Sequence, residues 1–229
     1  MFGLILSGGL RHLTLSARDH ALINGTMGQE IVTCFKTRDW TCHLCGVKLK
    51  GLMEVDHLKG HQRCSAAEIA PICQFCHDLR HPIWSVSRKR LFPILAPDLD
   101  QRALTRLSWA LLSEMTRPGG RDSFEEIAGA LSERESAAFE LLDGDNMESA
   151  LEAILVIRDR NGAEAARKLA ADLDAQLRYV PSCVRDGEPL RRWTPEGFRE
   201  VPIGLLHDAF GPAPDLDRLR LAAEELQAG

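Results

Sequence analysis

The pattern of apolar and polar positions changes near residue 96. Before that point, apolar residues alternate with polar ones over short stretches such as 3–7 and 11–18, which is typical of strands. After it, apolar residues recur every three or four positions over long stretches, which is typical of amphipathic helices. The pattern therefore predicts an α+β chain with short strands first and helices afterwards.

Within the first part, alternation predicts one hairpin over 4–15 and a second from 47–49 and 52–55, turning at Lys50-Gly51. Ile31 and Phe35 stand at helical spacing, so we expect a helix over 27–36. The segment 73–81 predicts a short helix that Pro82 ends. These elements predict a small mixed module over 1–95.

The second part carries apolar stripes that predict helices over 100–116, 123–144, 145–161 and 162–179. Asp100, Ser123 and Asp145 are the expected N-caps, and an apolar connector over 92–97 precedes the first helix. We expect a helical part over 96–182. The pattern weakens after Pro181, so 183–229 reads as an irregular C-terminal extension with a helix start at Thr194-Pro195 and a short terminal helix over 216–226.

Composition sets limits on the class of protein. The 229 residues are 45% hydrophobic, enough for one sizeable core or two small domains. No apolar run approaches the length of a membrane span, and the opening MFGLILSGG is too short for a secretory signal. We therefore expect no membrane insertion.

Charge is divided unevenly along the chain. Residues 1–95 carry 12 basic and 7 acidic residues, a net +5, whereas residues 96–229 carry 16 basic and 26 acidic, a net −10. Specific DNA-binding proteins usually present a denser basic face, and the acidic second part argues against a nucleic-acid footprint over the whole molecule. The one dense basic run, 87–90, is either a solvated turn or a phosphate contact.

Two Cys-x-x-Cys pairs, separated by 27 residues, are the strongest chemical signal: Cys42 with Cys45 and Cys73 with Cys76. Structural zinc binds four such sulfurs in a tetrahedron, and Gly46 suits the tight turn of a zinc knuckle. The alternatives are four buried thiols, or two disulfides, which such short spacing disfavours. The remaining Cys34, Cys64 and Cys183 are odd in number, which favours a reducing, cytoplasmic compartment.

The module resembles the HNH (ββα-metal) nuclease family in its motifs RDWTCHLCG, EVDH and IAPICQFCH. That resemblance implies a treble-clef arrangement in which Asp56 and His77 would bind a catalytic divalent ion (Mg, Mn or Ni) and His57 would activate water. One position departs from the family: Glu68 stands where its motif has Asn. Without catalysis, Asp56, His57 and His77 would form a hydrogen-bonded brace around the zinc loop.

A second resemblance covers about residues 4–200. The motifs SAR, TCHLCG, VDHLKGH, ICQFCH, LAPDLDQRALTRL and LRYVPS are similar, in order and spacing, to the IcmJ/DotN family of Dot/Icm (type IVB) secretion systems. It implies a cytoplasmic zinc-containing adaptor, recruited to the inner membrane through a partner, that binds a segment of the coupling ATPase or another secretion-complex subunit. The alternatives are a metal-dependent HNH endonuclease acting on DNA and a non-catalytic nucleic-acid binder.

Overall fold

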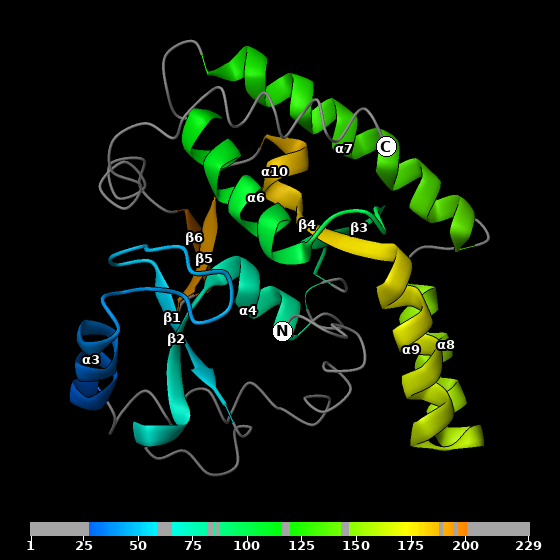
Figure 1. Cartoon of the computed structure of the whole chain (residues 1–229), viewed down its shortest axis with the longest axis horizontal. Coiled ribbons are helices and arrows are strands. Elements are labelled where there is room, and N and C mark those ends of the chain that lie inside the picture. The colour runs from blue at the N-terminus through cyan, green and yellow to red at the C-terminus, as the bar shows by residue number, and fades with distance from the viewer. Residues whose placement is uncertain are drawn as a thin grey trace.

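The computed structural model describes residues 28–58, 66–81, 85, 88–115, 120–142, 147–187, 190–194 and 197–200. The hairpin expected over 4–15 and the helix expected over 216–226 lie outside them. The described chain is α+β, as the sequence predicts: short strands and helices surround the cysteines, and mainly helices follow (Figure 1).

The N-terminal part begins with α3 (Gly28–Thr37), which confirms the helix expected there. Strand β1 (Met53–His57) pairs antiparallel with β2 (Ile69–Cys73), and η2 (Ala66–Glu68) leads into β2. Helix α4 (Gln74–Arg80) follows β2 without a break, and with His81 as its C-cap it ends before Pro82, as predicted. The strand pair and α4 together place both members of the second cysteine pair.

The hairpin predicted from 47–49 and 52–55 is wrong. The turn at Lys50-Gly51 exists, with φ +83° at Gly51, but the two flanking segments pair with different partners. Lys48 bridges to Thr41 and Leu49 N–H donates to Trp40 O, so the first segment closes the knuckle. The second segment pairs instead with 69–73, whose five residues are all buried and so lie at the centre of the module.

The connector predicted over 92–97 is largely a strand, β3 (Leu91–Leu95), paired antiparallel with β4 (Leu177–Pro181). The stripe that predicted a helix to residue 179 therefore ends early, and Leu177 belongs to β4. Its neighbours Tyr179 and Val180 favour a strand, and pairing with β3 across the sequence outweighs the local helical spacing.

The helices of the second part are α6 (Gln101–Met115), α7 (Arg121–Leu141), α8 (Met147–Asn161) and α9 (Ala163–Gln176). Asp100 caps α6, since its Oδ2 accepts from Ala103 N–H at 2.9 Å. Ser123 is not a cap, because α7 already begins at Arg121. Within the described residues, every helix is too short or too polar to cross a bilayer.

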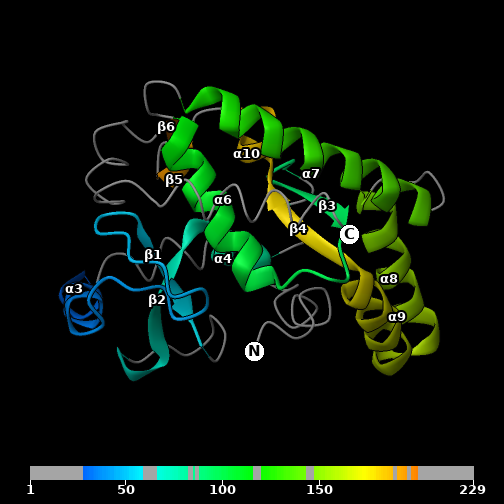
Figure 2. The same cartoon turned by 45° about the horizontal axis from the view of Figure 1, so that its top comes forward.

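After β4 the chain forms α10 (Ser182–Asp186) and a two-stranded hairpin of β5 (Arg191–Thr194) and β6 (Gly197–Glu200). Thr194, expected to begin a helix, is instead the last residue of β5. The pair α8–α9 lies at the opposite end of the molecule from α3, and α6 runs between the module and α7 (Figures 1 and 2).

Among the described residues, buried apolar side chains form two clusters, which the β3–β4 pair separates. On one face, Phe92, Ile94 and Val180 join the cysteines, α6 and α7. On the other face, Leu91, Leu177 and Tyr179 join α7, α8 and α9. The alternation of side chains along a strand explains how one strand pair serves both clusters. The cysteine-containing cluster thus draws on residues from both sides of position 96.

Candidate metal centre

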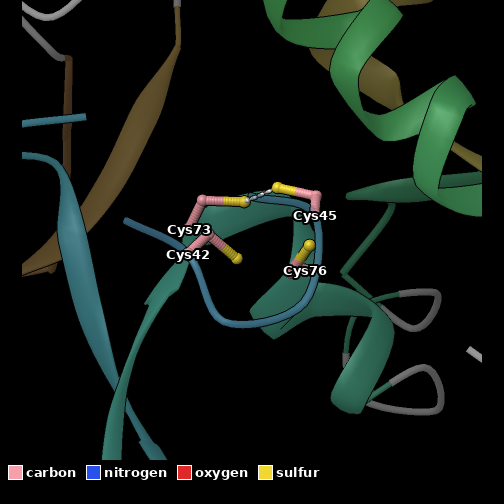
Figure 3. Close-up of side chains that lie close together, drawn as sticks. All are labelled: Cys42, Cys45, Cys73 and Cys76. Atoms are coloured by element: carbon pink, nitrogen blue, oxygen red, sulfur yellow. Dashed lines mark hydrogen bonds between the residues drawn. The ribbon is translucent and has the colours of Figure 1, made fainter. Parts of the chain in front are cut away.

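The sulfur atoms of Cys42, Cys45, Cys73 and Cys76 lie together, all within 4.8 Å of one another (Figure 3). Each residue is 0–1% exposed, and none forms a disulfide. Zinc about 2.3 Å from each of four tetrahedral sulfurs places the sulfurs about 3.8 Å apart. The Cys45–Cys73 separation of 3.7 Å matches that value, so the four cysteines are placed as in a structural zinc site.

The first pair is positioned by a tight knuckle. Cys42 N–H donates to Val47 O at 2.9 Å, and Gly46 N–H donates to Cys42 O at 2.9 Å. Gly46 has φ +77°, a left-handed conformation that favours glycine. The knuckle is fixed to β2, because His43 N–H donates to Pro71 O at 3.0 Å.

The second pair is positioned by the junction of β2 and α4. Cys73 is the last residue of β2 and the N-cap of α4, and Cys76 lies in the first turn of that helix. The side chains of both residues point toward the first pair (Figure 3). The antiparallel pairing of Met53 with Cys73 fixes the register of this junction relative to β1.

Helix α6 closes the site. Trp109 Nε1–H donates to Cys73 Sγ at 3.3 Å, and the Trp109 ring stacks on Phe75 with centroids 4.0 Å apart. Trp109 and Phe75 are each 1% exposed, so they keep water from the sulfurs. Arg102 Nε and Arg106 Nε both donate to Cys45 O, at 3.2 and 2.6 Å.

The chemistry of this donor set fits zinc. Burial raises the pKa of the Cys73 thiol well above its usual range, so a thiolate at that position needs a compensating cation. Four sulfurs leave no coordination position for substrate, which is characteristic of structural zinc. Within the described residues, no other set of three or more His, Cys, Asp or Glu side chains gathers its ligand atoms closely enough to hold an ion.

The trio Asp56, His57 and His77 lies beside this centre, on β1 and α4. Asp56 is 3% exposed; its Oδ2 lies 2.7 Å from His43 Nε2 and its Oδ1 lies 3.5 Å from Arg80 Nε. Burial alone would raise the pKa of Asp56, but the hydrogen bond with His43 and the charge of Arg80 lower it to about 2. The ionised carboxylate therefore connects the first knuckle to α4.

His77 has a different partner. Its Nδ1 lies 2.6 Å from Glu54 Oε2, and its ring packs edge-on against His81. Burial opposes its protonation, but the hydrogen bond and charge of Glu54 outweigh burial and raise the pKa of His77. Glu54 and Asp56 share one face of β1. Each is hydrogen-bonded to a different histidine, Glu54 to His77 and Asp56 to His43.

His57 is 4% exposed and follows Asp56 in β1, so the two side chains leave opposite faces of the strand. The structure therefore brings Asp56 and His77 to the same face but gives each its own hydrogen-bond partner, and it directs His57 away from them. Among the other expected residues, Cys34 and Cys183 are partly buried free thiols, and Cys64 lies outside the described residues.

Sequence reasoning missed the contributions of His43 and of three residues on α6: Arg102, Arg106 and Trp109. The α6 residues stand at i, i+4 and i+7, one face of a helix, which is a detectable signal. This spacing alone does not say what the helix face contacts, so it becomes informative only once the structure shows the face against the cysteine residues.

Comparison of the chain with models of known protein families gives no match, and comparison with curated proteins gives none either.

Proposed function

We propose that the chain is a zinc-stabilised adaptor that binds a segment of the coupling ATPase, or of another subunit, in a type IVB secretion system. The observation that carries the proposal is the set of four buried sulfurs. A centre with only cysteine ligands, enclosed by Trp109 and Phe75, stabilises a fold and offers no position for a reacting molecule. This supports a role in binding, with no reaction at the metal itself.

The resemblance to the IcmJ/DotN family supports the identity of the partner. Its motifs include both cysteine pairs, and LAPDLDQRALTRL (95–107) extends into the first half of α6. The same segment contains Arg102 and Arg106, which bind the first knuckle. The proposal places the adaptor in the cytoplasm, recruited to the inner membrane through its partner.

The proposal is tested by co-purification with the coupling ATPase of the same secretion system. We expect the zinc-loaded wild type to form a stoichiometric complex in size-exclusion chromatography. Cys73→Ser should lose zinc, solubility and the complex together, whereas Cys34→Ser, the matched control outside the cluster, should retain all three. A folded, metal-free Cys73→Ser that still captures the ATPase would contradict a role for zinc, and wild type that binds no ATPase would contradict the partner.

One observation keeps the endonuclease as a second candidate: Asp56, His57 and His77 are all present beside the zinc module. The test is nicking of plasmid DNA with Mg²⁺, Mn²⁺ or Ni²⁺. We expect none, because Asp56 and His77 are bound to His43 and Glu54 and do not face a common ion. Nicking by the wild type that disappears in His57→Ala would establish the nuclease instead.

A further inference from the structure

The two arginines that bind the knuckle retain unused donors. Arg102 and Arg106, one turn apart on α6, each donate an Nε–H to the same Cys45 carbonyl oxygen. A guanidinium has five N–H donors in a planar fork, so each side chain keeps four after this bond. Both residues are exposed, and within the described residues neither forms an ion pair with a carboxylate.

The outer nitrogens of both arginines lie close to Gly46. A β-carbon placed on Gly46 would lie 2.9 Å from Arg106 Nη2 and 3.0 Å from Arg102 Nη2. Both nitrogens are therefore near one point beside the Gly46 Cα, so the two guanidinium groups converge there. With φ +77°, residue 46 favours glycine, and a side chain there would meet the two arginines.

Within the described residues, no carboxylate balances the positive charge of the two arginines. Two cations at i and i+4 on a helix repel each other, and four thiolates with zinc would offset part of their charge. Neither arginine is hydrogen-bonded to a sulfur within the described residues; that bond comes from Trp109. The outward N–H groups are therefore available to an anion from outside the chain.

We propose that Arg102, Arg106 and Gly46 form a binding site for one oxyanion group, a carboxylate or a phosphate. Two guanidinium groups that converge on one oxygen provide short, charge-assisted hydrogen bonds. The neighbouring thiolates cancel long-range attraction, so a free ion binds weakly, and an oxyanion carried by a docked partner binds at a higher effective concentration. The proposal concerns a site and stands without the adaptor function.

The test is an NMR titration of the zinc-loaded, isotope-labelled full chain with two probes at constant ionic strength. Inorganic phosphate represents a phosphate source, and acetate represents a carboxylate source. We expect saturable shifts of the Gly46 amide and of the Arg102 and Arg106 Nε–H signals. The probe whose shifts saturate at the lower concentration identifies the preferred source. Absence of saturable shifts with both probes would overturn the proposal.

Variants locate the binding. Arg102→Lys with Arg106→Lys keeps both charges but removes the planar forks, so we expect affinity to fall about tenfold or more. Arg167→Gln with Lys168→Gln removes two exposed cations on α9, at the other end of the molecule, and should leave affinity unchanged. Zinc content and melting temperature verify that each variant folds. Equal affinity in the arginine-to-lysine variant and the wild type would contradict the site.

Discussion

At the scale of single residues, Trp109 links the metal centre to the core. Its indole N–H donates a hydrogen bond to Cys73 Sγ, and its ring stacks on the ring of Phe75. A hydrogen bond to a thiolate lowers the cost of concentrating negative charge in a buried site. Trp109 therefore contributes both to metal affinity and to packing, and substitutions can separate the two contributions.

Trp109→Phe removes the N–H donor and keeps most of the ring. We expect a loss of about 1 kcal/mol in the free energy of unfolding and faster transfer of zinc to a chelator. Trp109→Leu also removes the stacking partner of Phe75 and should cost roughly 2 kcal/mol more. Urea unfolding and chelator competition provide the measurements. Zinc transfer at the wild-type rate in Trp109→Phe would show that the N–H···S bond is unimportant.

The Glu54–His77 pair predicts a pH dependence. Because the pKa of His77 is raised in the folded state, its pair with Glu54 stabilises the fold fully below pH 6.5 and loses this effect as the pH rises through the folded pKa. Glu54→Gln should therefore cost about 1 kcal/mol at pH 6 and less at pH 9. Unfolding measured across this range tests it; a difference that grows with pH would be inconsistent with a protonated His77.

Tyr179 offers a substitution expected to do no harm. It is 1% exposed, and its hydroxyl has no hydrogen-bond partner within the described part of the chain. Burial accordingly raises the pKa of Tyr179 well above its usual range. Tyr179→Phe removes the buried hydroxyl and keeps the ring, so we expect unchanged stability or a gain of up to about 1 kcal/mol. A clear loss in thermal unfolding would reveal a partner for that hydroxyl.

At the scale of elements, α6 connects the metal centre to the helical part of the chain. It contacts the first knuckle through Arg102 and Arg106 and the second pair through Trp109. At its start, Gln101 exchanges two hydrogen bonds with the Tyr179 backbone of β4, at 2.9 and 2.8 Å. Helix α6 thus touches both cysteine pairs and the strand pair that separates the two apolar clusters.

Removal of zinc should therefore affect elements unevenly. Binding of structural zinc contributes on the order of 10 kcal/mol, and the cysteine-containing cluster includes residues of α6 and α7. After chelation we expect faster amide exchange in β2, α4 and α6. Helices α8 and α9 pack in the other cluster and should change least. Hydrogen–deuterium exchange read by mass spectrometry checks this; protection of α6 that is unchanged without metal would contradict the coupling.

Elements differed in how far the sequence determined them. The helices α3, α6 and α8 were predictable because caps, glycines and apolar stripes act over a few residues. Strands β3 and β4 were not, because they pair across more than eighty residues of sequence, and Leu177 fits a helical stripe equally well. The cysteine site was predictable from spacing alone, whereas the roles of His43 and Trp109 depend on contacts that no local pattern encodes.

At the scale of the whole molecule, the metal centre lies within the larger of the two apolar clusters. The cysteines share that cluster with Leu111, Leu131 and Val180, which come from α6, α7 and β4. A zinc ion held there would therefore organise more than a small appended module, and its loss would expose apolar surface from several helices. In the proposed adaptor, the metal would stabilise the fold that presents a surface to the partner.

The most direct test of this account is zinc analysis of the purified chain together with X-ray absorption at the zinc edge. The account predicts one zinc per chain with four sulfur neighbours at about 2.3 Å. A folded chain with little zinc, or a first coordination shell containing nitrogen or oxygen, would contradict it.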